Sequence, residues 1–151
     1  MMQKLIPLGD AVPPGVHLGF HLCYGDLNHK HFTEPDDLGL CVAISNMLTE
    51  KIQRPINWIH MPVPRDRDDE AYFHPLEGLR LNSETELYLG LIHLSDGIGG
   101  YRRRLKSAVA TRSEFGIATE CGFGRRPPET VLELLKLHAL AARDEEILLA
   151  N

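Results

Sequence analysis

The sequence predicts an α/β fold in which four parallel strands alternate with helices within a single domain, residues 1–151. Three observations favour this fold. Four short runs are rich in apolar and β-branched residues, a loop and then a helical pattern follow each run, and prolines or glycines separate the units. Strands that alternate with helices predict parallel pairing, because a helical crossover returns the chain to the same end of the sheet.

The first two units come from residues 16–80. We expect a strand over 16–23, and the acidic residues and proline of 33–36 predict the start of a helix that turns Leu38, Cys41, Val42, Ile44, Ser45 and Leu48 to one side. A second strand is expected over 56–61, ending at Pro62, because proline cannot donate a hydrogen bond to a ladder. The charged residues 65–70 predict an exposed turn, with a short helix through Tyr72 and a turn at 75–78.

The last two units occupy the remainder of the chain. A third strand is expected over 86–94, followed by a glycine-rich turn over 95–100 and a helix from Tyr101 to about Thr111. A fourth strand is expected over 115–119, with a loop at 120–126. Pro127, Pro128 and Glu129 then predict the start of a terminal helix.

Composition and charge limit the class of protein. The chain is 43% hydrophobic and 25% charged, as is ordinary for a globular domain. The net charge is -5, and the arginines form short groups and not a long basic stripe, which argues against nucleic acid as a partner. The N-terminus lacks the apolar run of a secretion signal, and no segment approaches the ~20 apolar residues that span a bilayer. We therefore expect a cytoplasmic protein without membrane contact.

Soft metal ligands lie near the ends of three predicted strands. His21 and Cys23 alternate along one strand and so share a face, His60 lies near the end of the next strand, and Cys121 follows the last. Zinc prefers thiolate and imidazole, and the carboxyl ends of parallel strands meet at one edge. The sequence therefore predicts a zinc site of His21, Cys23, His60 and Cys121. The alternatives are buried core residues and, for His60, a hydrogen bond that caps its strand; Cys41 is predicted to be core.

Several other polar groups are candidates for a functional role. His29 and His31 are either solvated or functional loop residues, and Asp26 is a candidate to orient a ligand histidine. Residues 97–100 are either an anion cradle before Arg102–Arg104 or a plain turn before a solvated arginine face. Arg125 and Arg126, close to Cys121, are candidates to bind a carboxylate.

Two motifs resemble a known family. His21-Leu22-Cys23-Tyr24 and Glu120-Cys121-Gly122 follow the order in which cobalamin-independent methionine synthase carries a His-x-Cys pair and an Asp-Cys-Gly segment. The chain resembles the catalytic C-terminal part of that family over roughly residues 16–142, including the strand that ends at His93 and the stretch 122–129. Where the family has a glutamate on its second zinc-binding strand, this chain presents His60.

The resemblance implies a fold and an activity. It implies a TIM barrel in which zinc binds a substrate thiol, such as homocysteine, that takes the methyl group of a reduced folate in methionine biosynthesis. It also implies that His93 or Asp96 assists proton transfer. His60 in place of a carboxylate removes one negative charge from the site, which makes the metal a better Lewis acid and its thiolate less nucleophilic, so that another methyl donor is possible.

The length of the chain predicts an incomplete barrel. An eight-stranded barrel takes about 250 residues, so four units amount to half of one. Because open sheet edges and an apolar face are avoided in stable monomers, we expect a homodimer or a complementing chain to complete the barrel. Two alternatives to the methyltransferase remain: a non-catalytic zinc-binding assembly module and a metal-free decarboxylase-like relative.

Overall fold

The computed structural model describes residues 2–25, 32–121 and 123–149. These residues contain a four-stranded parallel sheet in the order β1-β2-β3-β4, so that each strand pairs with its neighbour in sequence. The strands are β1 (Gly19–His21), β2 (Trp58–Pro62), β3 (Glu86–Ile92) and β4 (Gly116–Thr119). The predicted α/β class, with parallel strands that alternate with helices, is confirmed.

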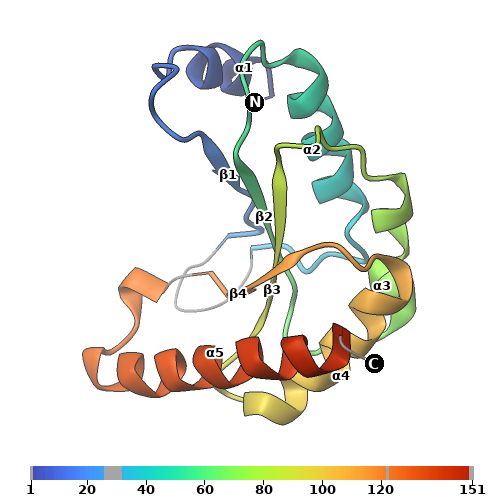
Figure 1. Ribbon diagram of the computed structural model, residues 1–151, viewed down its shortest axis with the longest axis vertical. Coiled ribbons are helices and arrows are strands. Elements are labelled where there is room, and N and C mark those ends of the chain that lie inside the picture. The colour runs from blue at the N-terminus through green and yellow to red at the C-terminus, as the bar shows by residue number, and fades with distance from the viewer. Residues whose placement is uncertain (1, 26–31, 122, 150–151) are drawn as a thin grey trace.

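Helices connect and flank these strands. They are α1 (Met2–Asp10), α2 (Gly39–Lys51), α3 (Glu70–Phe73), α4 (Gly97–Thr111) and α5 (Pro128–Leu149), with 3-10 turns η1 (His74–Gly78) and η2 (Phe123–Arg125). Figure 1 shows α2, α3 and α4 on one side of the strands and α5 across the lower part of the molecule. Among the described residues, no helix combines the length and apolar character needed to cross a bilayer.

One face of the sheet packs into the core. Ile59 and Met61 of β2 and Leu87 and Leu89 of β3 alternate with more exposed neighbours and are almost fully buried. The predicted face of α2 is confirmed, with Leu38, Cys41, Val42, Ser45 and Leu48 buried and Ile44 partly so. Removal of this apolar area from water is the main favourable contribution to folding.

The opposite face carries the polar residues. The register aligns His21 with His60, His60 with Tyr88, and Tyr88 with Gly116, which makes one row across all four strands. None of these positions is fully buried. A Cβ atom at Gly116 would lie 2.5 Å from the Tyr88 ring, so glycine leaves room for that ring. The row places two histidines side by side near the carboxyl ends of their strands.

Several element boundaries differ from the expected ones. β1 is shorter than the predicted strand, and Cys23 lies two residues beyond its end. α4 begins at Gly97, so the glycine segment predicted as a turn is the first turn of the helix. α2 begins at Gly39, later than the acidic residues had indicated, and residues 75–78 fall in η1. α1 was not predicted.

Asp69, expected in a solvated turn, caps α3 by accepting a hydrogen bond from the Tyr72 backbone.

The expectation of a solvated arginine face is wrong for Arg104. Its side chain is fully buried and makes two hydrogen bonds to Asp96, Nη1 to Oδ2 at 2.6 Å and Nη2 to Oδ1 at 2.9 Å. The same guanidinium donates to the carbonyls of Leu91 and Arg65. These four acceptors satisfy a buried cation and tie the start of α4 to β3 and to the segment after β2.

We predict that Arg104→Met destabilises the fold by about 3 kcal/mol, because it leaves the Asp96 carboxylate partly buried without its cation. Urea denaturation measures the change. Arg102→Met is the matched control, since Arg102 is largely exposed and solvent-screened ion pairs such as its pair with Asp144 contribute little to stability. Equal losses in the two variants would contradict the structural role of Arg104.

Candidate metal centre

The ends of the two outer strands converge. In a flat sheet, three strand spacings would separate β1 from β4 by about 14 Å. Here, however, the Sγ atoms of Cys23, just after β1, and Cys121, just after β4, lie 3.4 Å apart. Strand β4 is strongly turned relative to β2 and β3 in Figure 1. Twist and curvature therefore bring together residues from opposite edges of the sheet.

A bulge in β3 contributes to this convergence. Leu89 pairs with Ile117 and Ile92 pairs with Thr119, so two residues of β3 lie opposite the single residue Ala118 of β4. Such an extra residue bends a strand and increases its twist, and bulges often adjoin functional sites. Beyond the bulge, the backbone of Glu120 donates to the Ile92 carbonyl. This hydrogen bond continues the pairing up to the residue that precedes Cys121.

Three candidate ligands lie within reach of one ion. One nitrogen or sulfur atom from each of His21, Cys23 and Cys121 lies within 4.8 Å of the other two. His21 Nε2 is 3.0 Å from Cys121 Sγ. Partial desolvation of the ring lowers the pKa of His21, which favours the neutral imidazole that a metal requires. Cys23 and His21 are exposed, and Cys121 is half-buried.

This donor set fits zinc. Zinc bonds of about 2.3 Å to sulfur, arranged tetrahedrally, place two sulfur ligands about 3.8 Å apart. The observed separation of 3.4 Å differs from this by a few tenths of an ångström, which small side-chain rotations can supply. Two thiolates and one imidazole are soft ligands of the kind that zinc prefers. The three residues therefore have both the chemistry and the proximity that such a site needs.

His60 contacts Nδ1 of His21 and is not one of these three candidate ligands. The two Nδ1 atoms are 2.8 Å apart, and the ring centroids are 4.7 Å apart. If His21 binds a metal through Nε2, its Nδ1 carries the hydrogen and donates it to His60, which fixes the tautomer and the ring orientation. Gly90 makes room for this ring, since a Cβ atom there would lie 3.1 Å from His60 Nε2. The geometry therefore supports His60 as the partner that orients His21.

His93 lies near the candidate ligands, and both of its ring nitrogens have a partner. His93 Nε2 donates to the Val63 carbonyl at 2.8 Å, while Nδ1 lies 2.7 Å from Glu120 Oε2. Because a carbonyl can only accept, the close contact between Nδ1 and Oε2 needs one proton that the two groups share. Burial, followed by the charge of Arg104, lowers the pKa of His93 to about 4. Arg126 forms an ion pair with the other oxygen of Glu120.

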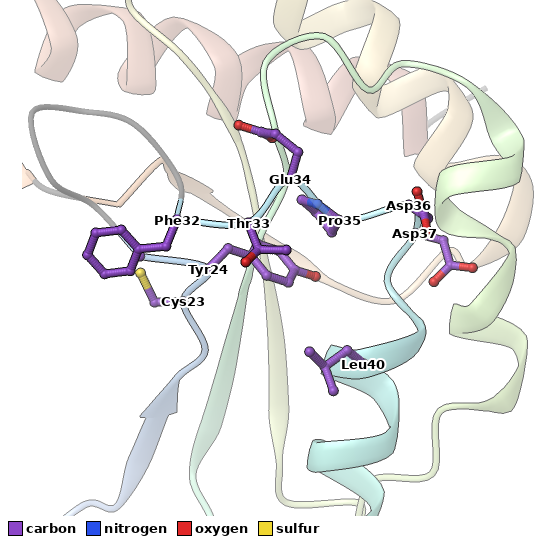
Figure 2. Close-up of a pocket in the computed structure, with 10 residues that line it drawn as sticks. Cys23, Tyr24, Phe32, Thr33, Glu34, Pro35, Asp36, Asp37 and Leu40 are labelled. Carbon is purple, nitrogen blue, oxygen red and sulfur yellow. The ribbon is translucent and has the colours of Figure 1, made fainter.

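Two cavities flank the thiol pair. Cys121 lines a cavity of about 1030 Å³ together with His93, Glu120 and Arg126, and its walls carry charges of both signs. Cys23 lines a smaller, more apolar cavity of about 710 Å³. Figure 2 shows Cys23 and Phe32 at one end of the smaller cavity and Leu40 of α2 toward the other. Glu34, Pro35 and Asp36 border both cavities, so an ion at the thiol pair would be approachable from two sides.

The remaining candidates are placed less centrally. Asp96 precedes α4 and binds Arg104, and it is not among the residues that line either cavity. Arg125 is exposed in η2, whereas Arg126 is half-buried in the wall of the larger cavity. The predicted loop candidates Asp26, His29 and His31 lie outside the described residues.

Glu120 lies in the candidate site, although no role was predicted for it. It occurs in the quoted motif with Cys121, yet nothing local indicates its partner, because His93 lies 27 residues away. The available signal was topological. His93 follows β3 and Glu120 follows β4, and these neighbouring parallel strands end at the same edge.

Comparisons of the chain with protein-family models, with curated proteins and with solved structures give no match. The resemblance to cobalamin-independent methionine synthase therefore stays a prediction from the motifs. What the geometry adds is the convergence of His21, Cys23 and Cys121.

We predict that His60 contributes to the acid sensitivity of the metal-free fold. Burial, with a smaller effect of His21, lowers the pKa of His60 from 6.5 to about 4. As the pH falls through this window, the unfolded chain takes up a proton that the folded chain excludes, so stability is lost. In His60→Gln, the drop in unfolding free energy between pH 6.5 and 4 should shrink, by up to about 3 kcal/mol.

Chemical denaturation at a series of pH values measures this drop. His74→Gln is the control for the substitution itself, because the His74 side chain is 74% exposed. An identical profile in His60→Gln and the parent chain would contradict the prediction.

Proposed function

We propose that the protein binds zinc through His21, Cys23 and Cys121 and transfers a methyl group to a thiol, such as homocysteine, from a reduced methyl-folate or a related donor. The observation that carries this proposal is the grouping of these three ligands within 4.8 Å at the carboxyl ends of the sheet. Ligands in parallel α/β sheets collect at that end.

The number of ligands supports catalysis over a purely structural site. Structural zinc sites use four protein ligands, whereas catalytic sites use three and leave one position for water or substrate. With His60 as the hydrogen-bond partner of His21, the part of the chain that the structure describes supplies three ligands. When bound there, zinc would lower the pKa of a thiol that reaches the open position and so supply a thiolate nucleophile.

The charged cavity supports a role for His93. His93 and Glu120 share a proton in the wall that also contains Cys121. We propose that this pair gives a proton to the donor nitrogen as the methyl group leaves, which makes that nitrogen a better leaving group. Between the two residues considered from the sequence, cavity lining favours His93 over Asp96, whose carboxylate is committed to Arg104.

Arg126 is the better placed of the two candidate anion-binding residues. It lines the charged cavity, and its Nε is buried with no hydrogen-bond partner among the described residues. We propose that the positive charge of this guanidinium attracts a carboxylate of a folate or an amino acid into the cavity, besides its ion pair with Glu120. Arg65 and Arg67 add positive charge to the same wall.

We also propose that the chain is about half of a TIM barrel, which a second copy or a complementing chain completes. In the described sheet, β1 and β4 are outer strands that each pair on one side only. Helix α5 exposes Leu132, Leu135 and Leu140, whose exposed fractions are 61%, 51% and 45%. These features equally suit a zinc-binding assembly module without catalysis, which the activity test below separates from the methyltransferase.

We predict one zinc ion per chain in protein purified without chelator, measured by elemental analysis. Cys23→Ser and Cys121→Ser should each lose most of this zinc, because each removes a thiolate from a three-ligand site. Cys41→Ser should keep it, because Cys41 is buried in the core and hydrogen-bonded to Tyr24. Zinc retention in both Cys23→Ser and Cys121→Ser would rule the site out.

We predict that the zinc-loaded chain methylates homocysteine when supplied with methyl-folate, detected by mass spectrometry of the product. His93→Gln should keep its zinc and lower kcat by about a hundredfold or more, as removal of an acid catalyst does. Activity should vanish in Cys121→Ser and persist in Cys41→Ser.

The solution mass, measured on the same samples, tests completion of the barrel. A dimer with zinc but without methyl transfer would favour the assembly module. A metal-free monomer would remove both proposals.

A further inference from the structure

The thiols of Cys23, which is exposed, and Cys121, which is half-buried, are as well placed for each other as for a metal. Cys23 Sγ and Cys121 Sγ are 3.4 Å apart, and a disulfide bond needs about 2.05 Å, so closure requires a movement of about 1.4 Å. Both cysteines follow short outer strands and not the middle of a helix. Side-chain rotation at the two strand ends can supply such a movement.

The third cysteine is separated from this chemistry. Cys41 is 2% exposed in α2, and its sulfur is 3.0 Å from the Tyr24 hydroxyl. Burial raises the pKa of Cys41 to about 11, which keeps it in the unreactive thiol form. Oxidation at low peroxide is therefore expected at Cys23 and Cys121 only.

We propose that Cys23 and Cys121 form an intramolecular disulfide when the metal-free chain meets a peroxide, and that this bond and a bound metal exclude each other. The first half of the proposal stands on the sulfur geometry alone, and the second half rests on the proposed zinc site. A disulfide consumes both thiolates, which leaves His21 as a single ligand of the three.

The chemistry balances with hydrogen peroxide as the oxidant. Cys23, the more exposed thiol, attacks one peroxide oxygen, the O–O bond breaks, and a sulfenic acid and one water form. The Cys121 thiolate then attacks the Cys23 sulfur, and the hydroxyl group leaves as a second water once it takes up the remaining proton. Two thiols lose two electrons and two protons, and one peroxide is reduced to two waters.

The bond would join the two edges of the sheet. It would link the end of β1 to the end of β4 and enclose a long loop, since 98 positions separate the two cysteines. A cross-link over such a loop restricts the unfolded chain and raises the denaturation midpoint when it does not strain the fold. The disulfide would therefore lock the curvature of the sheet while it disables the metal centre.

The test exposes the full chain, freed of metal by a chelator, to a small excess of hydrogen peroxide. Thiols are counted after denaturation, and peptides are mapped without reduction. We expect the count to fall from three thiols to one, with a Cys23–Cys121 peptide pair and a mass loss of about two hydrogen atoms. Cys41→Ser should form the same pair, while Cys23→Ser should form none. Three surviving thiols, or a bridge that contains Cys41, would overturn the proposal.

Zinc loading separates this inference from the proposed function. In the zinc-loaded parent chain, disulfide formation should slow by about tenfold or more, because the metal occupies both thiolates. A disulfide that forms in the metal-free chain while zinc fails to bind would leave the bond standing and remove the metal site. Zinc binding without any disulfide in the metal-free chain would do the reverse.

Discussion

The contact between Cys23 and Cys121 depends on the shape of the whole sheet. Their strands stand at opposite edges of a four-stranded sheet, so the sulfurs meet only if the sheet twists and curves at its carboxyl end. The bulge of β3 opposite Ala118 supplies local bending next to β4. The core of Ile59, Met61, Leu87 and Leu89 holds the strands in that shape, because burial of these side chains favours one packing of the sheet on its helices.

Two paired groups surround the candidate centre, each with a different task. On one side, His60 contacts Nδ1 of His21 and leaves Nε2 toward the Cys121 sulfur. On the other side, Nδ1 of His93 lies 2.7 Å from Oε2 of Glu120 in the wall of the charged cavity. A third pair, Arg104 with Asp96, is structural: it lies outside the cavity lining and fixes the start of α4. If a metal binds there, the His60 contact favours a neutral His21 imidazole, and the contact between His93 and Glu120 lies outside the three candidate ligands.

The sequence predicted the fold class and the three converging residues, because both depend on regular features. Alternation along β1 and the rule that parallel strands end together placed His21, Cys23 and Cys121 at one edge. Roles that depend on single long-range contacts were not predictable. His60 was expected as a ligand, which stays a prediction; its contact with Nδ1 of His21 comes from its place in the strand register, which the sequence did not define. Arg104 was expected in solvent, because nothing in the local sequence indicates that Asp96 and two backbone carbonyls accept its hydrogen bonds in the interior. The cap that Asp69 makes on α3, and the start of α4 at Gly97 and not at Tyr101, depend on capping and packing, which composition does not reveal.

The proposed metal centre requires one cation to bind His21, Cys23 and Cys121 together. X-ray absorption spectroscopy of the zinc-loaded chain reports the ligand atoms and their distances and so examines this requirement at the metal itself. We expect two sulfur ligands at about 2.3 Å and at least one nitrogen at about 2.0 Å, with one sulfur lost in Cys121→Ser. A shell of nitrogen and oxygen alone, or a spectrum that Cys121→Ser leaves unchanged, would contradict it.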